Sequence, residues 1–571
     1  MSKTHPQLTK NLLCLALLFA LALVPRLYSA LTVGWNWDYP GSFTFVNFDE
    51  GGSCRAALDG FEYSTFVGRQ TIAITELLGY PVRADAQGDY SAAKHYCHSV
   101  EHLRVARVYS ALSGSLTVVV LGVLALLLFP GKPQIAWTAA AMLALSGFHA
   151  SESHSGTVDA PSVFFVYLFI TCIVYARVSK NTLAVLASLP LFVAALWTKY
   201  WVFAAAAYLA FVPQGLWDKF SAGLSGLRLV LLFLGASLLA GLSTNLAFQS
   251  AGLYPCLALF YLLVPWRRIS IAMSIVCVLT PVLAYVVAQI DFVAAYTTGA
   301  MEGKFGTGYA AIGWNKLIRN PVNSAAVLIV GIGLPACLFI FRGVRAILED
   351  RESGPLWLCL VPLILFLAFM TFVSPITYYR HYLALIPLAA LLAAAGLWSS
   401  AWSRRRWFLV LFFCWPALLL VDLQEDFHAD PRIALRQWYS EHPDSNVFFG
   451  FYVSPPVSAL DRSRFFQPEY AFDDAANLHA GDYLVLSENW YDTAFANELN
   501  GPRVDRLDRL IKTKPEYTRF YRQVLAGQNP SLQLDTAIDV RNFMPELVVH
   551  RWLYGNFPLF VGDLKIYRIV H

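Results

Sequence analysis

The chain has 571 residues, of which 57% are apolar and only 14% are charged, and its mean hydropathy is +0.51. Soluble domains carry about 25% charged residues, so this composition excludes a string of soluble domains over most of the length. The net charge of +4 is small and the basic residues are scattered, which argues against a nucleic-acid-binding surface. The apolar residues form long runs, which predicts a polytopic α-helical membrane protein.

The predicted spans correspond to runs of ~20 predominantly apolar residues. These runs lie at 11–33, 108–129, 135–150, 160–176, 227–249, 269–288, 322–341, 355–373, 380–398 and 406–421, with a shorter one at 252–265. Segment 182–213 is apolar except for Lys199, and forms either one long span or two short spans that turn at Lys199. If 182–213 forms two spans, the short basic loops all lie on one side of the membrane, as the positive-inside rule requires. We therefore predict about thirteen spans and a cytoplasmic N-terminus. Segment 11–33 also resembles a signal peptide, but we expect it to be retained.

Two predicted outer loops are long, at 34–106 and 289–320. After the membrane domain at 1–421, charged residues become frequent, and 422–571 is predicted to be a soluble domain on the outer face. It begins with a helical pattern at 431–439 and contains strand-like segments at 446–452 and 482–487. We therefore expect a C-terminal α/β soluble domain beside the membrane body.

Of nine cysteines, only Cys54 and Cys97 fall in the first outer loop. An oxidising compartment outside the membrane favours a disulfide between them, which is the prediction. The alternative is metal coordination by Cys97 with His95 and His98.

Ionisable residues cluster where the predicted spans meet the outer face. The first cluster is the adjacent pair Asp49 and Glu50, followed by Gly51 and Gly52. Such a pair suits a general base, although a solvated turn is the simpler interpretation. The second cluster holds Glu152, His154 and Asp159. Asp159 would cap the next helix in the simpler interpretation, but ionisable groups at membrane depth favour a functional role.

Cations lie at the same predicted face. Lys199 stands between Trp197 and Trp201, and Arg380 precedes His381. These side chains would either clamp an anionic phosphate or anchor the chain at the interface by reaching toward headgroups.

The order of these motifs carries a family resemblance. The motifs are Asp49-Glu50, Arg107-Val-Tyr-Ser-Ala-Leu-Ser-Gly114, His154-Ser-Gly-Thr-Val-Asp-Ala-Pro161, Thr198-Lys-Tyr200 and Tyr379-Arg-His-Tyr-Leu383. Over residues 1–421 the chain resembles the GT-C glycosyltransferases, in particular the branch of protein O-mannosyltransferases and aminoarabinose transferases. The trefoil repeats of the eukaryotic protein enzymes and the Trp-Trp-Asp motif of oligosaccharyltransferases are not matched.

The resemblance implies an inverting transfer of a sugar from a polyprenyl-phosphate donor to an acceptor hydroxyl of a protein, lipid or polysaccharide. It implies Asp49 as general base, with Glu50 and Asp159 beside it. The cations implied for the donor phosphate are Lys199 and Arg380, then Arg107 and Lys94. The residues expected to orient acceptor or sugar are His154, Tyr379 and His381.

No metal or cofactor is expected, and the implied location is a bacterial inner membrane with the active site and C-terminal domain in the periplasm. The alternatives are a transporter or flippase of lipid-linked sugars, and a noncatalytic envelope-assembly protein.

Overall fold

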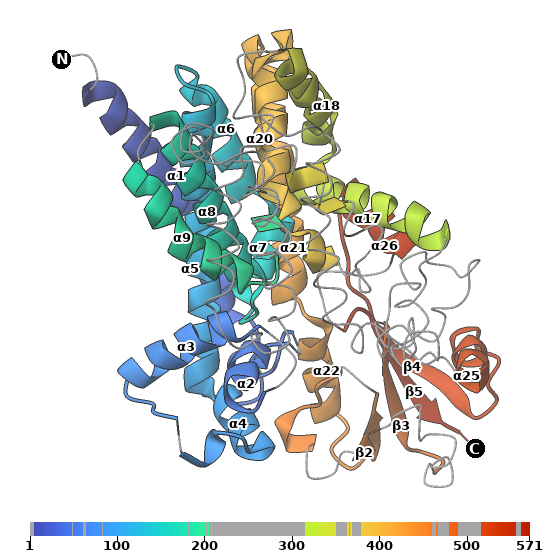
Figure 1. Ribbon diagram of the computed structural model, residues 1–571. Coiled ribbons are helices and arrows are strands. Elements are labelled where there is room, and N and C mark those ends of the chain that lie inside the picture. The colour runs from blue at the N-terminus through green and yellow to red at the C-terminus, as the bar shows by residue number, and fades with distance from the viewer. Residues whose placement is uncertain are drawn as a thin grey trace.

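The structure is a computed structural model in which both apolar helices and a β-sheet are seen (Figure 1). It describes residues 5–47, 49–60, 64–82, 84–179, 182–200, 203–204, 207, 314–349, 362–364, 366–367, 370, 379–450, 453–459, 464–465, 479–488, 515–554 and 561–570. The predicted spans at 227–249, 252–265 and 269–288 lie outside the described residues, as do most of the span at 355–373 and of the loop at 289–320.

The described part of the chain contains four helices that are long and apolar enough to cross a membrane. They are α1 (His5–Thr32), α5 (Val100–Leu128), α8 (Asp159–Ser179) and α21 (Arg406–His428). A bent pair, α17 (Trp314–Ile332) and α18 (Leu334–Glu349), makes a fifth if its two parts count as one span. Backbone groups in lipid must be satisfied within the segment, which long helices achieve. The protein is therefore a helical membrane protein.

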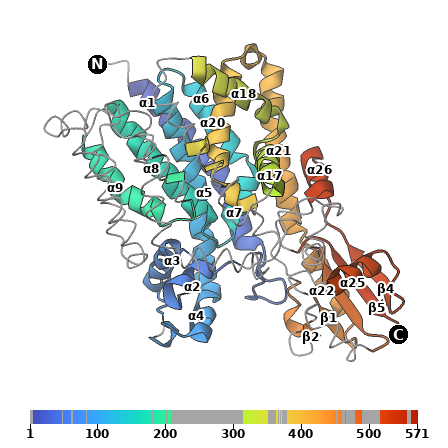
Figure 2. The same ribbon diagram turned by 45° about the vertical axis from the view of Figure 1, so that its right-hand side comes forward.

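The helices pack side by side (Figures 1 and 2), and the short helix α20 (Leu385–Trp398) is almost fully buried beside α18 and α6 (Pro133–Ala144). Helix α20 contacts α18 where both carry a glycine: a Cβ at Gly343 would lie 2.0 Å from the Leu392 carbonyl oxygen, and one at Gly396 would lie 2.0 Å from that of Phe339. Small residues at such a crossing let two backbones approach closely, as is common between membrane helices. Helix α9 (Thr182–Leu196) packs on α8 and ends before Lys199.

The two ends of the helix bundle differ in their residues. One end, here called the loop end, holds the end of α1 at Thr32 and the starts of α5 at Val100 and α8 at Asp159. The opposite end carries Lys132, the short helix η5 (Ala401–Arg404) and the exposed side chains of Trp402 and Trp407. Tryptophan and basic residues together are typical of a membrane interface.

Two predicted spans differ from the structure. The run 135–150 is divided into α6 (Pro133–Ala144) and α7 (Gly147–His154) because Ser146 caps α7, its hydroxyl accepting from the His149 N–H at 3.2 Å. The buried Arg26 guanidinium donates to the carbonyl oxygens of Leu143 and Ala144, both at 3.1 Å, and so satisfies the end of α6.

The run 322–341 is likewise not one straight span. The chain bends by 114° between α17 and α18, because Gly333 adopts φ +83° and lies against the Trp415 ring. Helix α17 begins at Trp314, so the predicted outer loop at 289–320 ends earlier than expected.

The first loop is helical. It contains α2 (Gly52–Leu58), α3 (Thr65–Leu77), the short helix η1 (Ala84–Ala86) and α4 (Tyr90–Cys97). These helices gather below α5 in the view of Figure 1, at the loop end of the bundle.

The C-terminal part forms a sheet with helices on both faces. Helix α21 continues to His428, so the expected domain boundary at 422 falls inside a helix, and α22 (Pro431–Ser440) follows. The strands are β1 (Val447–Phe449), β2 (Arg464–Phe465), β3 (Tyr483–Ser487), β4 (Leu532–Ile538) and β5 (Leu564–Ile569), in the order β2-β1-β3-β5-β4. Strand β1 is parallel to β2 and β3, whereas β5 is antiparallel to β3 and β4.

Alternating side chains give this sheet two buried faces. Phe449 and Val485 pack with Leu435 of α22, whereas Phe448 and Leu484 pack on the other face with Tyr521 of α25 (Pro515–Leu525). A short helix η6 (Val457–Ala459) follows β1, and α26 (Pro545–Tyr554) lies beside α17 rather than on the sheet (Figures 1 and 2).

Candidate active site

Asp49 and Arg380 meet at the loop end of the bundle. Asp49 lies in the turn before α2, and Arg380 lies in the short helix η4 (Tyr379–Tyr382) that leads into α20. Arg380 Nη2 forms an ion pair with Asp49 Oδ2, and its Nη1 lies 3.5 Å from Asn47 Oδ1. The Asp49 side chain is 32% exposed, so water or a ligand can reach this carboxylate.

A second ion pair joins Asp159 and Lys199. Asp159 is the first residue of α8, where a carboxylate is stabilised by the positive end of the helix. Its Oδ1 accepts from Lys199 Nζ at 2.5 Å, while its Oδ2 accepts no hydrogen bond from the described residues. The Asp159 side chain is fully buried, and the Lys199 side chain is 19% exposed.

Tyr200 connects the two ion pairs. Its hydroxyl donates to the Arg380 carbonyl oxygen at 2.5 Å and lies 3.4 Å from Asp159 Oδ1. The Ser64 hydroxyl, just before α3, also donates to the Trp197 carbonyl oxygen at 2.5 Å and ties the Lys199 turn to the first loop. Segments far apart in the sequence therefore form one polar network.

Glu152 borders this network, and its pKa is raised. It lies half-buried near the end of α7. Burial, and then the negative charge of Asp159, raise the pKa of Glu152 to about 7, while Arg380 and Lys199 oppose the shift. Glu152 is thus poised to exchange a proton near neutral pH.

Glu50 and Arg107 form a separate, fully buried ion pair behind Asp49. Arg107 Nε donates to Glu50 Oε1 at 2.7 Å and its Nη2 donates to Oε2 at 2.8 Å. The Gly156 N–H also donates to Oε1 at 2.8 Å, and Arg107 Nη1 donates to the Val33 carbonyl oxygen at 2.5 Å. Burial alone would raise the pKa of Glu50, but the Arg107 charge and these hydrogen bonds outweigh it and lower the pKa.

This buried pair joins the first loop to α1, α5 and the segment before α8. Both groups are fully inaccessible, so their effect on a substrate passes through the position of Asp49.

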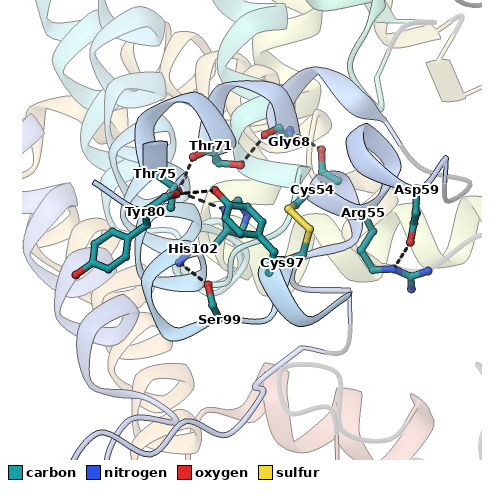
Figure 3. Close-up of a disulfide and its surroundings, with 12 residues drawn as sticks. Cys54, Arg55, Asp59, Gly68, Thr71, Thr75, Tyr80, Cys97, Ser99 and His102 are labelled. Atoms are coloured by element: carbon teal, nitrogen blue, oxygen red, sulfur yellow. Dashed lines mark hydrogen bonds and ion pairs between the residues drawn. A yellow bond between two sulfur atoms is a disulfide. The ribbon is translucent and has the colours of Figure 1, made fainter. Parts of the chain in front are cut away.

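A disulfide holds the helix that comes after the acidic pair. Cys54 of α2 and Cys97 of α4 are bonded, with Cα atoms 5.6 Å apart (Figure 3). Gly51 has φ +80°, and a Cβ there would lie 2.9 Å from the Cys97 carbonyl oxygen, so only glycine fits.

Because Cys97 is in the disulfide, its sulfur is not a metal ligand. Burial, followed by the charges of Lys94 and Arg55, lowers the pKa of His98 to about 4.

The other expected site residues surround the network. His154 is buried with its ring against Phe427, 4.3 Å between centroids. Tyr379 and His381 share η4 with Arg380, and the Tyr379 ring contacts that of His550 at 4.9 Å. Lys94 is exposed on α4, its Nζ 5.8 Å from the Tyr90 ring centroid.

Tyr200, which belongs to the network, and Glu152, which borders it, have no specific role in the sequence-based hypothesis. The signal for Glu152 is an ionisable group at predicted membrane depth. Tyr200 stands in the motif Thr198-Lys-Tyr200, but the sequence gives it no role, because that role depends on the backbone of Arg380 lying beside it.

No protein-family model and no curated protein matches the sequence. Among solved structures, the chain is similar to the Archaeoglobus fulgidus oligosaccharyltransferase in its apo form, with zinc and sulfate, and tethered to an acceptor peptide. The sequence identities are 12%, 12% and 11%, and the TM-scores are 0.46, 0.44 and 0.46. The matches cover 98%, 97% and 98% of this chain and 88% of each of those chains. TM-scores below 0.5 indicate a distant likeness, so the function is inferred from the residues of this chain.

Proposed function

We propose that the protein is an inverting membrane glycosyltransferase that moves a sugar from a polyprenyl-phosphate donor to an acceptor hydroxyl. The observation that carries the proposal is the network of Asp49, Arg380, Tyr200, Asp159 and Lys199 at the loop end of apolar helices. A donor with an apolar tail lies in the bilayer and presents its phosphate and sugar at the membrane surface, which is where these side chains gather.

Each side chain has a role in the reaction. The acceptor oxygen attacks the anomeric carbon opposite the phosphate, the bond from that carbon to the phosphate oxygen breaks, and the lipid phosphate leaves with the electron pair. Asp49 accepts the acceptor proton, and Lys199 and Arg380 stabilise the negative charge on the phosphate. Asp159 holds Lys199 through its buried carboxylate and acts on the donor through the position of that ammonium. The leaving phosphate is weakly basic, so the reaction needs no general acid.

The ion pair between Arg380 and Asp49 couples donor binding to catalysis. While Arg380 Nη2 is paired with Asp49 Oδ2, that oxygen is occupied and does not accept a hydrogen bond from the acceptor hydroxyl. A phosphate that approaches Arg380 competes with Asp49 for the same guanidinium. Donor binding therefore releases Asp49 to accept a proton, and we expect the donor to bind before the acceptor reacts.

We further propose that the loop end and the C-terminal domain, residues 422–571, face the periplasm of a bacterial inner membrane. Lys132 and Arg404 at the opposite end agree with the positive-inside rule. The disulfide at the loop end agrees with an oxidising compartment.

The test is a transfer assay on the purified protein with a panel of polyprenyl-phosphate sugars labelled in the sugar. We expect release of the lipid phosphate, and a loss of about 10²–10⁴-fold in rate for Asp49→Asn. The control is Asp89→Asn, the same change in the same loop at an exposed cap of α4 that asparagine also fills. If Asp49→Asn kept full activity, Asp49 would not be the base.

A Lys199→Met variant tests phosphate binding, with Lys132→Met at the opposite end as its control. We expect the KM for the donor to rise in Lys199→Met alone. If no panel member were consumed while the labelled lipid crossed the bilayer of a vesicle containing the protein, the transporter alternative would replace this proposal.

A further inference from the structure

Helix α26 comes from the C-terminal part of the chain but packs into the membrane body. Met544 and Leu547 are buried in a cluster with Val330 of α17 and with Leu419 and Leu423 of α21. Figures 1 and 2 both show α26 next to α17 and away from the sheet.

The start of α26 is fixed by side chains of α21. Asp422 Oδ2 accepts from the backbone N–H groups of Phe543 at 3.0 Å and of Met544 at 2.6 Å. The Asn542 amide donates to Asp422 at 3.2 Å and to Asp426 at 2.9 Å. A carboxylate at the start of a helix satisfies N–H groups that have no partner within the helix.

Glu546 of α26 completes the sharp bend between α17 and α18. The first turn of α18 presents few free N–H groups: Pro335 has none, and the Ala336 N–H donates to the Gly333 carbonyl oxygen at 3.2 Å. The remaining Leu334 N–H donates to Glu546 Oε1 at 3.2 Å, and Trp415 Nε1 donates to the same oxygen at 2.5 Å. Gly333 has no side chain with which to cap α18, so the C-terminal part supplies the cap.

The same helix also touches the turn that carries Arg380. The ring of His550, one turn after Glu546, packs edge-on against the ring of Tyr379, with centroids 4.9 Å apart. Tyr379 directly precedes Arg380 in η4, and α17 also contacts η4. Helix α26 thus contacts the bent helix pair through Glu546 and the arginine turn through His550.

We propose that α26 is a positioning element of the active site, in which Glu546 caps the bent helix pair and His550 holds the turn that directs Arg380 toward Asp49. The C-terminal part of the chain then sets the geometry of the donor phosphate site, although it supplies no group that touches the phosphate. The effect of His550 on donor binding rests on the proposed function, whereas the capping of α18 by Glu546 does not.

The test compares Glu546→Leu, which removes both acceptor oxygens, with Glu546→Gln, which keeps one. The matched control is Glu441→Gln, at an exposed position after α22. Hydrogen exchange is measured on the full chain in detergent, over the peptide that contains Leu334. We expect exchange about tenfold faster in Glu546→Leu, a rate close to wild type in Glu546→Gln, which keeps the one oxygen that Leu334 and Trp415 share, and no change in the control. If Glu546→Leu does not fold, Glu546→Asp decides the matter, because its shorter side chain draws the oxygen away from the Leu334 N–H, and a wild-type rate there would overturn the cap.

The positioning role of His550 is tested by measuring sugar transfer in His550→Ala and His550→Phe. The control is Val549→Ala, on the exposed side of α26. We expect a several-fold rise in the KM for the donor with little change in kcat for His550→Ala, and recovery in His550→Phe, which keeps a ring against Tyr379. An unchanged KM in His550→Ala would overturn the positioning role. A wild-type protein that consumes no polyprenyl-phosphate sugar would defeat the proposed function instead, and the exchange experiment would still decide whether Glu546 is the cap.

Discussion

The buried pair of Glu50 and Arg107 offers a direct test of how the acidic loop is held. In Glu50→Gln the side chain keeps its size but loses its charge and one of its two acceptor oxygens. Arg107 remains fully buried, with its Nε and Nη2 now facing one carbonyl oxygen and an amide that is itself a donor. The Gly156 N–H, which donates to Oε1 at 2.8 Å, competes for the same remaining oxygen.

The expected cost can be worked out from this geometry. Removing one partner of a buried ion pair costs about 3–5 kcal/mol, because the other charge stays buried without compensation. An exposed carboxylate contributes about 0–1 kcal/mol. The control is therefore Glu76→Gln on α3, which is exposed and accepts a long 3.4 Å hydrogen bond from the Val82 N–H.

The assay is the free energy of unfolding of the purified protein in mixed micelles, measured alongside sugar transfer. We expect Glu50→Gln to lose about 3–5 kcal/mol of stability and to lower the transfer rate, while Glu76→Gln changes neither by much. The double variant with Arg107→Met should recover part of the lost stability, because it removes the uncompensated charge. A loss below about 1 kcal/mol in Glu50→Gln would contradict the buried, charge-compensated pair.

Three further outcomes are expected. Because burial raises the pKa of Glu152 to about 7 in the folded protein, its folded state binds the proton more tightly than the unfolded state. The free energy of unfolding should therefore fall as pH rises from about 4.5 to about 7, and Glu152→Gln should flatten that part of the pH titration. Removing the disulfide by Cys54→Ser and Cys97→Ser should lower stability by about 2–5 kcal/mol in thermal unfolding, since it closes a loop with a sequence separation of 43. Arg380→Lys should keep the charge but raise the KM for the donor, because an ammonium cannot bind phosphate through two parallel hydrogen bonds.

The membrane class could be predicted from the sequence alone, because apolar runs about as long as a bilayer is thick leave little choice of environment. The grouping of ionisable residues could also be predicted. Asp159, Lys199 and Arg380 stand beside or within apolar runs, Asp49 lies in the first predicted outer loop, and the basic loops indicate that all four face one side. The sequence could not show which carboxylate meets which cation, since that depends on how distant helices and loops pack against one another.

The tertiary structure decided the roles within each pair. Asp49 and Glu50 are neighbours in sequence, yet one lies at an accessible surface beside Arg380 and the other is buried against Arg107. A turn points successive side chains in different directions, and only the packing of α1 and α5 behind the loop makes one of them internal. The bend at Gly333 is similar: an apolar pattern predicts a span, but the cap that completes the break comes from Glu546, at the other end of the chain. Sequence thus determined the environment of this protein and the inventory of its charges, and the tertiary structure determined their partners, because pairing is set by contacts between distant segments.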